Sequence, residues 1–213
     1  MTERNTEQLI GSLARELAPV HALRPPVLRS LLWLAAVTLV VAAAVLRWAN
    51  FGLFAARYAE PRQALECAAM LLTGITATIA AFHLSLPDRT SLWRYAPLPP
   101  LALWIATSSL GCMQHGMGLG PAGDRLGESS RCFIFIVVVS VPLAILLYAV
   151  LRRARPLQPL PVALTAALGV AALAAFTLQF FHPFDTTVID FALHAAAMLV
   201  VVGLAGATRR ALA

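Results

Sequence analysis

The sequence predicts an all-α integral membrane protein with six transmembrane helices and a short amphipathic helix at its N-terminus. Two observations predict this class. Hydrophobic residues make up 60% of the 213-residue chain and charged residues only 12%, with a mean hydropathy of +0.78, which is far from the composition of soluble domains. The apolar residues also run in long uncharged blocks without an amphipathic period, so the lipid bilayer is the expected solvent.

Residues 1–29 are predicted to form a cytoplasmic arm in front of the membrane domain. The stretch 5–18 is typical of a helix, because Asn5 can cap it and Gln8 follows three residues later in a capping-box relation. Its apolar residues form one stripe, which consists of Leu9, Ile10, Leu13 and Leu17. The stripe either lies on the lipid surface or docks in a groove of a cytosolic protein. The two acids on the polar side favour a protein, since lipid-surface helices prefer Lys and Arg there.

Six apolar blocks are long enough to cross a bilayer, which takes roughly 17 to 25 residues each. The predicted spans are 30–46, 63–86, 97–113, 132–151, 160–180 and 188–207. The connections combine Pro or Gly with charged residues, as in "YAEPRQ" and "FHPFDTT". The chain therefore divides into the arm, a membrane domain over 30–207 and a cytoplasmic tail over 208–213.

The basic residues predict the orientation. All 16 of them are arginines, and they flank the apolar blocks without forming a patch with interleaved aromatics, so direct nucleic-acid binding is not expected. With the N-terminus inside, eleven arginines fall in inner segments and five in outer ones, which predicts that both termini are cytoplasmic. In a bacterium the protein would lie in the inner membrane, with its outer loops in the oxidising periplasm.

Two cysteines are expected at the same depth on the outer face. Cys112 ends the third predicted span and Cys132 begins the fourth, and consecutive spans joined by one loop are expected to be neighbours. A disulfide or a functional thiol pair is one interpretation. The other is two unrelated buried residues, because free cysteine is among the most buried residue types.

Other candidate metal ligands gather on the same face. They are His115, His182, Asp185, Asp190 and His194. Thiolate, imidazole and thioether groups suit zinc or copper(I), and Asp190 and His194 stand four residues apart on one helical face. Asp190 can equally be a carboxylate favoured by the helix dipole. No paired CxxC motif is present, so no cofactor is required, and a transient zinc or copper site stays open.

The second span carries further polar residues. Glu66 lies about one turn from the outer interface and can face the same cluster, whereas Cys67 is interpreted as core filler. His83 lies near the inner end, so it cannot share a level with His194.

Long gapless stretches then point to a family. They are "LIGSLARELAPVHALRPPVLRSLLWL" near the start, "EPRQALECA", "PLPPLALWIATSSLGC", "CFIFIVVVSVPLAILLYAVLRRARPLQP", and "HPFD" followed by a histidine. In these stretches the chain resembles the NrsF family, bacterial inner-membrane negative regulators of extracytoplasmic-function sigma factors. The resemblance covers nearly the whole length.

The resemblance implies a six-span anti-sigma factor and not an enzyme. Its N-terminal segment, roughly 6–17 here, would sequester the sigma factor, and periplasm-facing cysteines would sense oxidant or metal and release it. The sensing pair would be Cys112 and Cys132. The family pattern has a further cysteine before the proline of the last outer loop, where this chain has His182, and this difference leaves a mixed thiol–imidazole site open.

Two alternative functions are a membrane thiol oxidoreductase and a metal or small-molecule transporter. A membrane thiol oxidoreductase would prefer a CxxC pair, but Cys112 and Cys132 lie twenty positions apart. A metal or small-molecule transporter usually shows broken helices or repeats with polar groups at mid-membrane, and the spans here are nearly free of charge at that depth. The sequence makes no prediction of oligomeric state.

Overall fold

The computed structural model describes residues 3–16, 22–49, 51–115, 122–181 and 188–212. These ranges contain α-helices and short 3-10 helices and no strand. The α-helices are α1 (Glu3–Glu16), α2 (Pro26–Trp48), α3 (Phe51–Tyr58), α4 (Pro61–Leu84), α5 (Leu98–His115), α6 (Ala122–Leu151), α7 (Pro159–Leu178) and α8 (Val188–Ala207), and the 3-10 helices are η1 (Ser91–Tyr95), η2 (Arg152–Ala154) and η3 (Arg209–Leu212). The all-α class is therefore confirmed.

The helices α2 and α4 to α8 correspond to the six predicted spans. Four segments are long and apolar enough to cross a membrane, namely Pro26–Trp48, Pro61–Leu84, Ser130–Ala154 and Pro159–Leu178. The remaining two helices, α5 and α8, lie at the third and sixth predicted spans, and their crossing stays a prediction.

Proline marks where several of these helices begin. Pro26, Pro61 and Pro159 each stand at the first helical turn of α2, α4 and α7. Proline is suited to that position because its ring fixes φ near the helical value and the N–H that it lacks would have no partner in the helix. The same residues that interrupt the hydrophobic blocks in the sequence therefore begin the helices in the fold.

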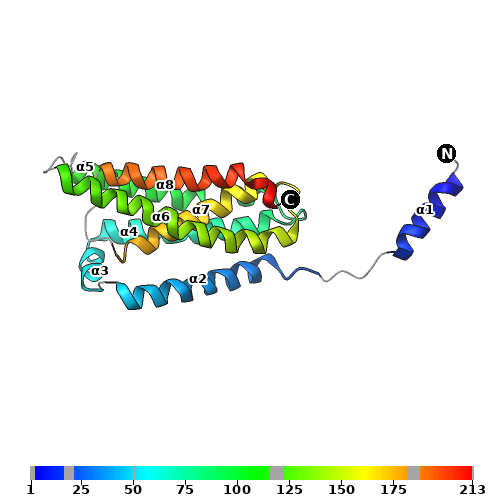
Figure 1. Ribbon diagram of the computed structural model, residues 1–213, viewed down its shortest axis with the longest axis horizontal. Coiled ribbons are helices and arrows are strands. Elements are labelled where there is room, and N and C mark those ends of the chain that lie inside the picture. Colours follow the sequence, from blue (N-terminus) through cyan, green and yellow to red (C-terminus); the bar gives the residue numbers. More distant parts are fainter. Residues whose placement is uncertain (1–2, 17–21, 50, 116–121, 182–187, 213) are drawn as a thin grey trace.

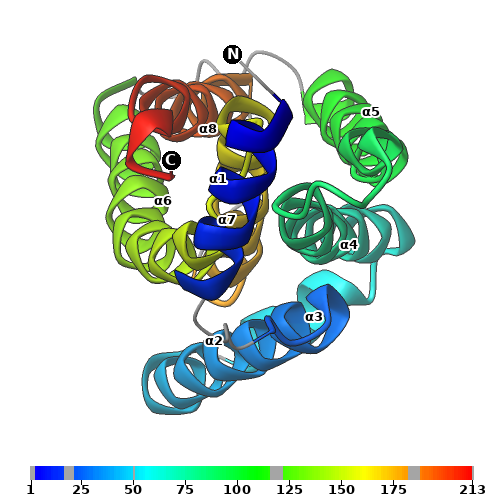
Figure 2. The ribbon, with the colours of Figure 1, turned by 90° about the vertical axis from the view of Figure 1, so that its right-hand side faces the viewer.

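The helix α7 forms the centre of the bundle. It packs on α4, α6 and α8, and Figure 2 shows it between these helices. Two glycines permit the closest approach. A Cβ atom on Gly169 would lie 2.7 Å from Thr78 Oγ1 and 3.0 Å from Thr78 N, and one on Gly74 would lie 2.7 Å from Leu173 Cγ. Small residues at such crossings let membrane helices gain van der Waals contact.

The two ends of the bundle carry elements that the hydrophobic pattern did not predict. The short helix α3 lies in the connection between α2 and α4, where Phe54 stacks on Phe180 with 4.3 Å between ring centroids. At the other end, η3 folds back on α7, and Leu212 is fully buried in the core with Val162 and Ala163. The predicted tail thus contributes to the core.

The helix α1 was predicted over 5–18 and is observed over Glu3–Glu16. Figure 1 shows it apart from the bundle, beyond the end that carries the C-terminus. Its apolar stripe is uncovered, because the side chains of Leu9, Ile10 and Leu13 are 58%, 55% and 55% exposed. Leu17, the fourth residue of the predicted stripe, lies outside the described residues.

Candidate functional site

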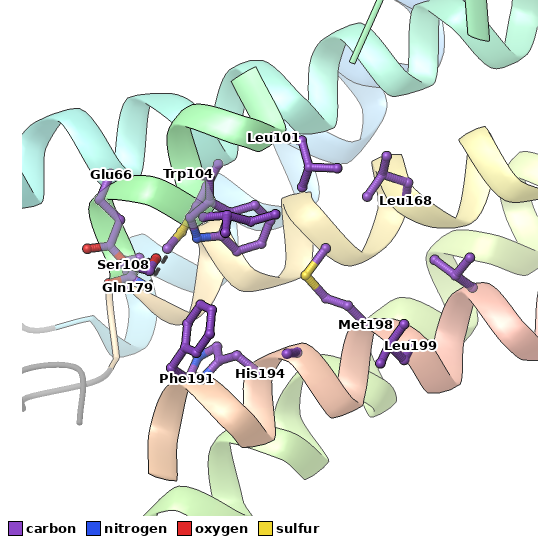
Figure 3. A pocket seen from close by; sticks show the side chains of 14 residues that line it. Glu66, Leu101, Trp104, Ser108, Leu168, Gln179, Phe191, His194, Met198 and Leu199 are labelled. Carbon is purple, nitrogen blue, oxygen red and sulfur yellow. Dashed lines mark hydrogen bonds between the residues drawn. The ribbon is translucent and has the colours of Figure 1, made fainter. Parts of the chain in front are cut away.

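A cavity of about 400 Å³ lies between α4, α5, α7 and α8. Its polar lining residues are Glu66, Ser108, Gln179 and His194. Figure 3 shows these four toward one end of the cavity, with Leu101, Leu168 and Leu199 toward the other. The cavity is therefore amphipathic along its length, and its polar end belongs to the half of the bundle predicted to face outward.

A buried carboxylate organises the polar end. Glu66 is only 6% exposed, and its Oε1 accepts a hydrogen bond of 2.6 Å from Ser108 Oγ. Its Oε2 lies 3.2 Å from Arg62 Nη1, in a pair spaced four residues apart on α4. Such i, i+4 spacing places both side chains on one face of the helix. Because a lone charge buried among apolar helices is costly, the guanidinium and the hydroxyl together make this carboxylate tolerable.

Arg62 also links α4 to the last turns of α5. Its Nη1 lies 3.5 Å from the carbonyl oxygen of Thr107. A Cβ atom on Gly111 would contact Arg62 Nη1 and lie 3.0 Å from Cζ, so the guanidinium rests directly on the backbone of α5. This contact lies one residue before Cys112 in the sequence.

Aromatic and sulfur-containing side chains form the walls next to the polar end. Trp104 and Phe191 line the cavity from α5 and α8, together with Met70 and Met198. Gln179 Nε2 donates to Met70 Sδ at 3.7 Å. A thioether is a weak acceptor, so the hydrogen bond of this amide at the edge of the cavity is weak.

The two predicted sensing cysteines lie on different helices, and the structure places the side chain of Cys132. Cys112 lies in the last turn of α5, with its side chain outside the described part. Cys132 is buried at 4% exposure, in a core cluster that includes Met70 and Trp104. The helix α6 begins at Ala122, earlier than predicted, but its membrane-spanning segment begins at Ser130. Cys132 is therefore near the start of the span, as expected.

The helices that carry the two cysteines are not the packed neighbours that we expected. In the described ranges α5 packs on α4 and α8, whereas α6 packs on α7 and α8. Figure 2 shows α5 and α6 on different sides of the bundle. The pairing of Cys112 with Cys132 stays a prediction.

The predicted metal ligands are only partly described. His182 and Asp185 lie outside the described residues, as do the side chains of His115 and Asp190. His194 lines the cavity that Glu66 also lines. That Glu66 faces a cluster of metal ligands on the outer face stays a prediction. Among the side chains that the structure places, no group of three or more His, Cys, Asp and Glu residues is arranged to hold a metal ion.

Several residues of the site carried a weak signal or none in the sequence. The spacing of Arg62 and Glu66 was a usable signal, since it is a helical ion-pair spacing. Ser108 and Gln179 carried none, because their partners lie on another helix. At the inner end, His83 stacks on Trp93 with 4.0 Å between ring centroids, well away from the cavity, as its predicted depth requires.

Comparison with known proteins supplies the family. The family model NrsF, described as negative regulator of sigma F, matches residues 13–212. Searches of curated proteins and of solved structures gave no match. The family match extends from within α1 through all seven later α-helices, so it covers the site as well as the fold. It implies a negative regulator of a sigma factor and favours a regulatory over a catalytic role. The chain belongs to the NrsF family.

Proposed function

We propose that the protein is a bacterial inner-membrane anti-sigma factor that sequesters an extracytoplasmic-function sigma factor through α1 and the arm that continues to residue 29. The observation that carries this proposal is the uncovered apolar stripe of α1. Leu9, Ile10 and Leu13 are each more than half exposed, and burial of one such side chain contributes about 1.5 to 3 kcal/mol. A helix that presents this stripe fits a hydrophobic groove on a partner.

The polar side of α1 supports a protein partner over the lipid surface. Glu7, Arg15 and Glu16 are exposed there, which gives two acids and one base over residues 6–16, where the structure places the side chains. Lipid-surface helices favour an excess of Lys and Arg, because bacterial lipids are commonly anionic. An arm with this balance of charge gains little from the bilayer surface.

The distribution of arginines supports a cytoplasmic position for the arm and its partner. In Figure 1, α1 lies beyond the end of the bundle where α6 ends and α7 begins. That end carries Arg152, Arg153, Arg155, Arg209 and Arg210. Segments rich in arginine stay inside when membrane helices insert, and the cytoplasm is where a sigma factor works.

The signal is received at the opposite, periplasmic end. Cys112 and Cys132 respond to oxidant or to a transient zinc or copper ion, with His115 and His182 as further ligands. Contacts in the bundle offer a route inward. Gly111 of α5 rests on Arg62 of α4, α4 packs on α2, and α2 continues into the arm. The signal must favour one state of the arm over the other, since it shifts an equilibrium only by its differential affinity.

Co-purification from native membranes tests the anti-sigma role. The full chain is compared with a variant that lacks residues 1–20, and bound proteins are identified by mass spectrometry. We expect a small sigma factor with the full chain and its loss on truncation. Absence of any sigma factor from both samples contradicts the proposal.

A cysteine series tests the sensor separately. Cys112→Ser and Cys132→Ser are compared with Cys67→Ser, a matched control because Cys67 is also buried at 4% exposure but lies in α4. We expect the first two to change induction of a sigma-dependent reporter by oxidant or metal, and the control to respond as wild type. An unchanged response in all three removes the thiol sensor and leaves the anti-sigma role standing.

A further inference from the structure

The cavity between α4, α5, α7 and α8 has the size and lining of a ligand site. Its volume of about 400 Å³ falls within the range of small-molecule pockets, which is roughly 300 to 1,000 Å³. Its lining is mostly apolar with four polar residues toward one end (Figure 3). We propose that this cavity binds an uncharged, planar ring compound of the quinone class that reaches it from within the bilayer.

The cavity is accessible from the lipid phase. Ile105 of α5 and Leu199 of α8 line it and are 49% and 72% exposed. Both residues lie on helices predicted to cross the membrane, where exposed apolar side chains face lipid. A ligand with an apolar tail can therefore enter between α5 and α8 and leave its tail along Leu168 and Leu199.

The charge at the polar end selects an uncharged head group. Arg62 neutralises Glu66 at 3.2 Å, and Ser108 occupies the other carboxylate oxygen. A phosphate or ammonium head would bring a charge without a matching countercharge into an apolar site, at a high desolvation cost. A neutral head group with hydrogen-bonding oxygens avoids that cost.

Hydrogen-bonding groups suited to such oxygens are present. Within the described part of the chain, Gln179 Nε2 donates to a thioether sulfur at 3.7 Å, and a ring carbonyl oxygen is a stronger acceptor than sulfur. A carboxylate oxygen can accept more than one hydrogen bond, so Glu66 can also take a hydroxyl of the reduced, hydroquinone form. The site can thus hold either form without changing its own charge.

The walls suit a flat ring. Trp104 and Phe191 stand on two different helices that line the cavity, as Figure 3 shows, and aromatic faces and edges stabilise a ring by offset or edge-to-face contact. Met70 and Met198 provide polarisable sulfur atoms for further contact with the ring. A saturated acyl chain would use neither the aromatic walls nor the amide.

A binding experiment with the full chain tests this proposal without reference to a sigma factor, so it can fail or succeed independently of the anti-sigma role. The protein is reconstituted in nanodiscs of synthetic lipid free of quinone, and a short-tailed benzoquinone is titrated, with empty discs subtracted. We expect saturable binding of one molecule per chain. Binding no greater than partition into empty discs overturns the proposal.

Two variants on one helix locate the site. Ala195 lines the cavity, whereas Ala192, three residues earlier, is exposed and does not. We expect Ala195→Phe to weaken quinone binding by at least about tenfold because the ring fills the cavity, and Ala192→Phe to bind as wild type. Equal binding by both variants overturns the proposal. If Ala195→Phe does not fold, Gln179→Leu replaces it, with the same expected loss.

A competitor distinguishes a ring site from an acyl-chain site. A straight-chain alcohol of the same length as the quinone is added at up to a hundredfold excess. We expect it to leave the bound quinone in place. Displacement of the quinone by the alcohol, when both are present at the same mole fraction, would show that the cavity binds any apolar chain. That result contradicts a site for planar rings.

Discussion

The central helix α7 and the N-terminal helix α1 use their apolar residues in opposite ways. In α7, residues on all sides are buried, among them Val162, Ala166, Val170 and Ala174. In α1, the apolar residues form one stripe and are exposed. A helix that is apolar all round belongs in the interior of a bundle, whereas a one-sided helix needs a second surface. The partners of α7 are in this chain, and those of α1 must come from elsewhere.

The side chains at the α7 surface that contacts α4 and at the stripe of α1 also differ in size. The surface of α7 toward α4 is built on Gly169, where an added Cβ atom would lie 2.7 Å from Thr78 Oγ1 and 3.2 Å from the carbonyl oxygen of Gly74. The stripe of α1 consists of large aliphatic side chains. Small residues let two helix backbones approach, while large ones insert as anchors into a groove. The first surface stabilises the bundle, whereas recognition of a partner is the role that we propose for the second.

The largest effect is expected from substitutions in the apolar stripe of α1, which should lower the affinity for the sigma factor. The double variant Leu9→Asp with Leu13→Asp should weaken sigma-factor binding by about a thousandfold, or about 4 kcal/mol, because each removes an anchor and introduces a charge into the interface. The bundle should unfold as in wild type, since α1 stands apart from it. Titration of purified full-length protein with the co-purified sigma factor measures the affinity.

The matched control is Gln8→Asp with Ser12→Asp, which adds the same charge at the same spacing away from the stripe. We expect an affinity within about threefold of wild type, in line with the small effect of residues outside an interface core. A loss as large as that of the stripe variant would show that net charge, and not the apolar stripe, controls binding.

In the bundle, the largest effect is expected at the buried ion pair. Glu66→Ala should lower the free energy of unfolding by about 3 kcal/mol, because it leaves Arg62 buried without its main partner. Glu60 also contacts Arg62, at 3.3 Å, but its side chain is 44% exposed, so Glu60→Ala should cost less than about 1 kcal/mol. The free energies of unfolding of Glu66→Ala and Glu60→Ala are compared by denaturation in detergent micelles, followed by circular dichroism. Equal losses of stability in the two variants would contradict the expectation that the buried carboxylate contributes more than the exposed one.

The close approach of α4 and α7 gives the next effect. Gly169→Ala places a Cβ atom 3.0 Å from the backbone nitrogen of Thr78, so the helices must separate, and we expect a loss of about 2 kcal/mol. Gly203 of α8 has no atom within 4 Å of its would-be Cβ, and Gly203→Ala should be neutral or stabilising. Thermal unfolding of both variants in the same micelles measures these changes in stability. Wild-type stability of Gly169→Ala would contradict the expectation.

The smallest effect is expected at Gly11, on the side of α1 away from the stripe. A Cβ atom there meets nothing within 4 Å, and alanine favours a helix over glycine by about 1 kcal/mol. Gly11→Ala should therefore order α1 in advance and tighten sigma-factor binding by about fivefold. Weaker binding would mean that the partner selects a conformation of the arm other than this helix.

The helices themselves could be predicted from the sequence because bilayer length and apolar composition determine them. The predicted span 63–86 became α4, Pro61–Leu84, and 188–207 became α8 with the same bounds. The helix α3 was missed because "FGLFAARY" is too short to cross a bilayer. Its order depends on Phe54 stacking on Phe180, a contact that sequence cannot show.

The site could be predicted only where it lies along one helix. From its depth, Glu66 was expected only to be able to face the outer cluster. Its observed pairing with Arg62 agrees with their spacing of four residues on α4. The partners on other helices, Ser108 and Gln179, depend on how α4, α5 and α7 pack together. The expected packing of α5 on α6 failed for the same reason, because adjacency in the chain does not determine which membrane helices meet.

Photo-crosslinking in native membranes tests the central claim most directly. A photoreactive amino acid is introduced at Leu13, on the stripe, or at Arg15, on the opposite side of α1, and crosslinked products are identified by mass spectrometry. We expect a sigma-factor adduct from position 13 and little from position 15. Adducts from position 13 to lipid or to the bundle of this chain, with none to a sigma factor, would contradict this expectation.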